Sequence, residues 1–148
     1  MPDVWLNDEV INLYMQLLAR HDEERCARET GRLRNHYFNS FFLTQLDGQS
    51  GYNYGGVRRW TRKVDVFKVS KVFVPVNINN VHWCMAVVCM QAREIRYLDS
   101  MGGPGRRCCS ALQRWVEDES ADKRQLKYST KDWAVVPPPP GTPQQENG

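Results

Sequence analysis

The sequence predicts an α+β domain, because helical and strand patterns occupy separate stretches of the chain. Amphipathic helices are predicted over 7–20 and 106–120, and three β-rich apolar runs lie between them at 72–78, 81–89 and 95–99. The first run contains a proline, which is typical of an edge or bulged strand. The second is apolar on both faces, as expected of a central strand. We therefore expect a mixed sheet flanked by helices.

The first predicted helix carries apolar side chains at the i, i+3 and i+4 spacing of one helical face. Asn7 or Asp8 can cap its start, because a short polar side chain accepts from the free backbone N–H groups there. The face consists of Val10, Ile11, Tyr14, Leu17 and Leu18.

The remaining segments are assigned from composition. Residues 21–35 are charged and contain a glycine, so we expect a solvated connection, whereas the apolar cluster 36–46 suits a short buried helix. Residues 47–56 are rich in Gly, Asn and Ser and are predicted to form a loop. Residues 126–136 are expected to form a last strand, followed by an extended, polyproline-like stretch within 137–148.

Composition narrows the class of protein. The 148 residues fit one domain, and 20 basic against 17 acidic residues give a net charge of +3, too small to indicate a nucleic-acid or membrane partner. No run approaches the roughly 20 apolar residues of a transmembrane helix, and the first residues lack the pattern of a signal peptide. The five cysteines show no Cys-x-x-Cys spacing, so we predict no metal site and no disulfide, but reduced thiols in an intracellular compartment.

Two residues on neighbouring predicted strands form a candidate catalytic pair. His82 lies in the second strand and Asp99 ends the third, and the tight turn between these strands implies antiparallel pairing. An aspartate in hydrogen-bond reach would hold the imidazole in one tautomer and stabilise the imidazolium. On these residues alone, a core histidine and a turn-forming aspartate explain the pattern equally well.

A series of ordered motifs changes this balance. The chain resembles the ubiquitin-like-protein-specific cysteine proteases, most closely their SUMO-specific (sentrin-specific) branch, which have a papain-like fold. The motifs that carry the resemblance are Trp5-Leu-Asn-Asp-Glu-Val-Ile-Asn-Leu-Tyr-Met15, Phe38-Asn-Ser-Phe-Phe42, Gly56-Val-Arg-Arg-Trp-Thr61, Val74-Pro-Val-Asn77, Val81-His-Trp-Cys84, Tyr97-Leu-Asp-Ser-Met101 and Pro143-Gln-Gln-x-Asn-Gly148.

The resemblance implies roles for individual residues. His82 corresponds to the general base, Asp99 to the acid that orients it, and Gln145 to the side chain that donates to the oxyanion. Trp5 and Trp83 correspond to two tryptophans that cover the diglycine tail of the substrate and leave no room for a Cβ. The positions at which the family contacts SUMO correspond to Asp8, Phe38, Arg59 and Trp60.

The nucleophile of this family is not found among residues 1–148. The family pattern continues past Gly148 to Asp-Cys-Gly, so we expect the chain to be an incomplete catalytic domain, shortened at its C-terminus. Cys84 points to the same sheet face as His82, but packing is the better interpretation. Cys108 and Cys109 lie at a predicted helix start, where a thiol pKa can fall. By the family layout this helix is at the surface, and we assign neither thiol a catalytic role.

The resemblance implies a SUMO-specific cysteine protease that processes precursors and cleaves isopeptide bonds. Its partners would be SUMO and SUMO-conjugated proteins, its location intracellular and nuclear, its state monomeric, and it would need no cofactor. The alternative is an inactive, protease-like SUMO-binding module or gene fragment. We expect no proteolysis by residues 1–148 alone, and poor solubility where absent helices leave apolar surface exposed.

Overall fold

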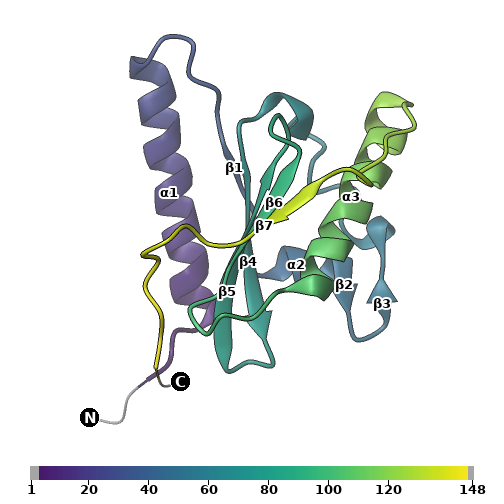
Figure 1. The fold of residues 1–148 in the computed structure, drawn as a ribbon. Helices are drawn as coiled ribbons and strands as arrows, with labels where there is room; N and C mark the ends of the chain where they lie inside the picture. Colours follow the sequence, from purple (N-terminus) through teal and green to yellow (C-terminus); the bar gives the residue numbers. More distant parts are fainter. Residues whose placement is uncertain (1–3, 147–148) are drawn as a thin grey trace.

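The computed structural model describes residues 4–146, and the order of its elements is that expected of the predicted α+β class (Figure 1). The helices are α1 (Asp8–Arg28), α2 (Phe41–Leu46) and α3 (Arg106–Arg124), with 3-10 turns η1 (Tyr54–Gly56) and η2 (Val66–Lys68). The strands are β1 (His36–Tyr37), β2 (Asp47–Gly48), β3 (Gly51–Tyr52), β4 (Val72–Ile78), β5 (His82–Cys89), β6 (Glu94–Leu98) and β7 (Ala134–Val136).

Five strands form a mixed sheet in the order β1-β4-β5-β6-β7, which confirms the predicted architecture. The central pairs β4–β5 and β5–β6 are antiparallel, whereas β1 and β7 lie parallel to their neighbours. Because β1 pairs with β4 only at Val72 and Phe73, the rest of β4 has a partner on one side alone. Pro75 falls in this part of β4, as expected of a proline at a sheet edge.

Helices cover both faces of the sheet, with α1 on one side and α2 and α3 on the other (Figure 1). The main core lies on the second side, where alternate residues of the strands meet Trp115 and Leu112 of α3 and Phe42 of α2. Phe42 packs edge-on against Trp115, with ring centroids 5.4 Å apart. His82 and Cys84 belong to the strand face that continues into Ala86 and Val88 of this core.

Helix α1 is longer than predicted, because its charged second half remains helical to Arg28. The expectation of a solvated connection from residue 21 is wrong there. Asp22 is only 3% exposed, and it accepts hydrogen bonds from the backbone and side-chain N–H groups of Asn35 at 2.7 and 3.0 Å. The carboxylate therefore anchors the chain that returns to β1.

The apolar face of α1 is only partly covered. An amphipathic pattern normally turns its apolar stripe toward a core. Here, however, the described part of the chain buries Met15 and leaves several residues about half exposed or more, namely Val10, Leu13, Tyr14 and Leu17. The predicted poor solubility is consistent with this stripe and stays a prediction. Within residues 4–146, no helix combines the length and apolar character needed to cross a bilayer.

Three further segments differ from the predicted elements. The cluster 36–46 begins as strand β1 and only then forms helix α2, and the predicted loop 47–56 contains the β2–β3 hairpin and η1. The last strand is limited to Ala134–Val136. Short elements of this kind are held by tertiary contacts rather than by local pattern, which explains why sequence periodicity did not define them.

Candidate active site

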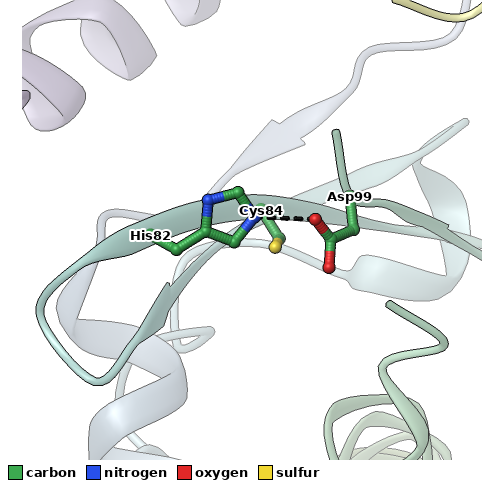
Figure 2. Close-up of side chains that lie close together, drawn as sticks. All are labelled: His82, Cys84 and Asp99. Atoms are coloured by element: carbon green, nitrogen blue, oxygen red, sulfur yellow. Dashed lines mark hydrogen bonds and ion pairs between the residues drawn. The ribbon is translucent and has the colours of Figure 1, made fainter. Parts of the chain in front are cut away.

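The register of β5 and β6 brings three reactive side chains to one end of the sheet. Met85 pairs with Leu98, so the next position along the register sets Cys84 opposite Asp99. His82 is two residues from Cys84 on the same strand and therefore points to the same face. The structure thus brings together the predicted pair His82 and Asp99, and adds Cys84 to it (Figure 2).

His82 and Asp99 are joined by a short hydrogen bond. Nε2 of His82 lies 2.7 Å from Oδ1 of Asp99, and the two side chains are only 14% and 10% exposed. Figure 2 shows the other ring nitrogen, Nδ1, on the edge of the imidazole that points away from both Asp99 and the Cys84 sulfur. With Nε2–H donating to the carboxylate, Nδ1 is left as the acceptor nitrogen.

Backbone donors fix the Asp99 carboxylate. The N–H of Met101 donates to Oδ1 at 2.8 Å and the N–H of Gly103 donates to Oδ2 at 3.1 Å. Burial acts to raise the pKa of Asp99, but the hydrogen bonds from His82 and Met101 outweigh it and hold the pKa below its usual value. A Cβ at position 103 would collide with Oδ2, so glycine allows the close approach of this loop.

Cys84 is a protonated thiol beside the pair. Burial raises its pKa to about 11, with contacts to Tyr97 lowering it and Asp99 raising it. A nucleophilic cysteine needs a lowered pKa and an imidazole nitrogen that accepts its proton. The pKa of Cys84 is raised instead of lowered. No imidazole nitrogen is placed to accept its proton, because Nε2 of His82 is engaged by Asp99 and Nδ1 points away. The structure thus agrees with the interpretation that Cys84 packs beside the pair and is not the nucleophile of a protease.

The cysteines of α3 are buried, which corrects their predicted surface position. Cys108 is 7% and Cys109 2% exposed. Burial raises the pKa of both thiols, so the lowering that a helix start can produce does not occur here.

A cavity of about 420 Å³ opens beside the pair. Both His82 and Asp99 line it, together with Val76 of β4, Tyr97 of β6 and Cys108 of α3. Its position gives molecules from solvent a path to the carboxylate and the imidazole.

Gln145 reaches this region from the C-terminal segment. Its backbone N–H donates to the carbonyl of Ser100 at 2.8 Å, and its side-chain Oε1 accepts from the Ser100 hydroxyl at 3.1 Å. Gln145 is therefore hydrogen-bonded to Ser100, the residue that follows Asp99 in the chain. The motif that contains it ends at Asn147 and Gly148, which are outside the described residues.

The two predicted tail-binding tryptophans lie in connected segments. Nε1–H of Trp83 donates to the carbonyl of Leu6 at 2.9 Å, which ties the N-terminal segment to β5. Trp5 is the residue before this contact and is 56% exposed. Trp83 therefore lies on the face of β5 opposite His82, and Trp5 lies in the N-terminal segment that Trp83 binds.

The predicted SUMO-contacting residues fall into two groups. Arg59 is exposed and Trp60 is partly buried against the core, so both present surface. Asp8 accepts a hydrogen bond from the Ser40 hydroxyl at 2.7 Å and is half-buried. Phe38 is 3% exposed and stacks on Phe42 at 3.7 Å between centroids, so it packs in the core, and its contact with SUMO stays a prediction.

The structure also separates the two adjacent arginines. Arg58 donates twice to the Asp122 carboxylate, at 3.0 and 2.8 Å, while Lys123 donates to the Arg58 carbonyl. Nearby Glu119 is 1% exposed and accepts from Thr61 at 2.8 Å. These contacts anchor the 58–61 segment on α3. Sequence reasoning missed them because residue spacing carries no signal for partners some 60 positions apart.

A mixed sheet between helices carries an imidazole–carboxylate pair at one end, the arrangement of base and orienting acid that hydrolases with a nucleophilic side chain share. Residues 4–148 match the profile of the Ulp1 protease family, C-terminal catalytic domain, and the chain belongs to this family of cysteine-type proteases.

Curated relatives agree with this assignment. The chain is 42% identical over 138 residues to ubiquitin-like-specific protease 1A of Arabidopsis thaliana, covering 89% of this chain and 26% of that protein. It is 38% identical over 145 residues to human sentrin-specific protease 2, covering 97% of this chain and 23% of that protein. The chain thus spans about a quarter of the length of these relatives.

Solved structures share the fold. An Ulp1 SUMO protease whose catalytic cysteine is oxidised to a sulfenic acid superposes with a TM-score of 0.76 at 30% identity, covering 99% of this chain and 61% of that one. The Ulp1 protease domain in complex with Smt3, the yeast ortholog of SUMO, gives 0.72 at 31% identity, covering 99% and 60%.

Proposed function

We propose that residues 1–148 form the larger part of a SUMO-specific cysteine-protease catalytic domain, which processes precursors and cleaves isopeptide bonds. The observation that carries the proposal is the 2.7 Å hydrogen bond from His82 Nε2 to Asp99. It fixes the tautomer in which Nδ1 can take a proton from an attacking thiol. The similar Ulp1 structures, one with an oxidised catalytic cysteine and one in complex with the yeast SUMO ortholog, support it.

The attacking thiol is proposed to come from the Asp-Cys-Gly sequence that follows the Pro-Gln-Gln motif in this family. The thiols near the pair support this assignment, because burial keeps Cys84 and Cys108 protonated. Gln145, held against Ser100, would donate its side-chain N–H to the oxyanion.

SUMO is proposed to bind across two regions. Its diglycine tail would pass between Trp5 and Trp83, while its folded body would meet Arg59, Trp60 and the Asp8 end of α1. Arg59 is the better charged contact of the arginine pair, because Arg58 is already paired with Asp122. From the family resemblance we also propose that the protease is a monomer that acts on SUMO-conjugated proteins inside the cell, in the nucleus.

Binding and cleavage are tested separately. Calorimetric titration of the 148-residue chain with mature SUMO is expected to show binding that weakens in Arg59→Glu and remains in Arg34→Glu, a control that reverses the charge of another exposed arginine, one that pairs with Glu23. Equal binding of all three proteins, or none, would contradict the proposed interface.

Cleavage is tested with a SUMO C-terminal fluorogenic substrate. We expect no turnover by the 148-residue chain and turnover by a gene product that extends through Asp-Cys-Gly, abolished in His82→Ala. Turnover by the 148-residue chain that is lost in Cys84→Ala would refute the assigned nucleophile. SUMO binding without turnover by the full gene product would favour the inactive binding module.

A further inference from the structure

The His82, Cys84 and Asp99 side chains offer three kinds of donor atom that transition metals bind. One nitrogen, one sulfur and one carboxylate oxygen, one from each residue, all lie within 4.8 Å of one another. Figure 2 shows the sulfur on the same side of β5 as the hydrogen-bonded imidazole nitrogen and carboxylate. Three protein donors with an open fourth position is the arrangement of zinc sites that keep a water ligand.

We propose that these three residues bind Zn²⁺, or a chemically similar ion, in a site that removes His82 from proton transfer. The donor set is mixed nitrogen, sulfur and oxygen, which suits Zn²⁺ and disfavours Mg²⁺ and Ca²⁺, ions that prefer oxygen ligands alone. The sequence alone predicted no metal site, because the ligands come from two strands and lack a recognisable spacing.

The site is built on rigid elements. Cys84 and His82 occupy alternate positions of β5, and the register of β5 with β6 sets Asp99 beside them. Backbone N–H groups of Met101 and Gly103 already orient the carboxylate, as hydrogen bonds to ligating carboxylates do in metal sites. The adjacent cavity supplies a route for the ion and room for a water ligand.

Metal binding balances in charge and in protons. The Cys84 thiol releases its proton to solvent, and the proton on Nε2 of His82 is transferred through solvent to Nδ1. The ion then replaces the 2.7 Å hydrogen bond between His82 and Asp99. Thiolate and carboxylate together neutralise the divalent charge, so the buried site carries no net charge. Because Nδ1 now bears a proton, it can no longer accept one from a thiol.

Cobalt provides a direct readout. Co²⁺ added to the metal-free chain is expected to give a near-ultraviolet thiolate-to-cobalt absorption band and the visible bands of a four-coordinate ion. Competition with Zn²⁺ should remove both. Cys84→Ser is expected to lose the thiolate band and to weaken Zn²⁺ binding at least about tenfold, since even residues outside the ligand sphere cost 10–100-fold.

Cys89→Ser is the matched control, because Cys89 is a buried cysteine at the other end of the same strand. It should keep the band. A band that survives in Cys84→Ser, a band lost in Cys89→Ser, or no cobalt binding by the folded chain would overturn the proposal. Should Cys84→Ser fail to fold, the ¹¹³Cd resonance of the wild-type chain decides: a shift for one sulfur ligand supports the site, and one for none or several contradicts it.

These measurements do not depend on proteolysis, so their outcome is separate from that of the proposed function.

Discussion

Replacing Asp99 by asparagine tests the geometry of the His82 pair most directly. The carboxylate accepts three hydrogen bonds: from His82 at 2.7 Å and Met101 at 2.8 Å on Oδ1, and from Gly103 at 3.1 Å on Oδ2. Asparagine has the same shape but one acceptor oxygen. In either orientation of the amide, its NH₂ group faces at least one donor.

The least costly orientation sacrifices the Gly103 bond. A hydrogen bond to a charged group contributes about 1.5–3 kcal/mol, so we expect Asp99→Asn to lower the free energy of unfolding by about 2 kcal/mol at pH 7. Because the pKa of Asp99 is lowered by folding, its stabilising contribution is present above its unfolded pKa of roughly 4 and is lost as pH falls through the folded value. The difference in stability between the two proteins should therefore be smaller at an acidic pH below roughly 4 than at pH 7.

Urea unfolding followed by tryptophan fluorescence at both pH values measures this difference. Asp132→Asn is the control, because Asp132 is exposed and its replacement should change stability by less than about 0.5 kcal/mol. Equal stability of Asp99→Asn and wild type at pH 7, or the same gap at both pH values, would refute the reasoning.

Three other substitutions probe packing and charge. Gly103→Ala forces a Cβ against the Asp99 carboxylate and should lower the free energy of unfolding by about 1–3 kcal/mol in the same assay; unchanged stability would show that the loop yields freely. Burial raises the pKa of Glu119, so the stabilising contribution of its protonated form should be lost as pH rises above about 4.5 through the folded value. Glu119→Gln should flatten this fall in stability, measured as urea midpoints from pH 4 to 7. Parallel curves for the two proteins would contradict this. Phe38→Ala should cost about 3–5 kcal/mol in chemical denaturation, whereas Phe41→Ala, at a side chain 48% exposed, should cost far less; similar losses would place Phe38 outside the core.

The sheet could be predicted from sequence because its strands carry strong local patterns. The run from Val81 to Cys89 is apolar on both faces, and it became the central strand β5. The tight turn before β6 then required antiparallel pairing, which brought Asp99 near His82. Local pattern and chain connectivity were sufficient for this part of the site.

The parts that could not be predicted depend on contacts between distant residues. Asp22 looked solvated because it lies in a charged run, yet Asn35 satisfies it inside the fold. Phe38 matched a contact position, but its stacking on Phe42 is visible only in three dimensions. Likewise, the Arg58 carboxylate partner comes from α3, some 60 residues away.

The segment between β7 and Gln145 contains five prolines, at positions 137–140 and 143. It is fixed at both ends, by the pairing of Val136 with Arg96 and by the hydrogen bond from Gln145 N–H to Ser100. Proline restricts φ in every state of the chain, so little conformational entropy remains to be lost when the segment is ordered. The prolines therefore help to position Gln145 by lowering the entropy that the segment loses on folding. Replacing them would loosen the position of Gln145 without removing any contact that Gln145 makes.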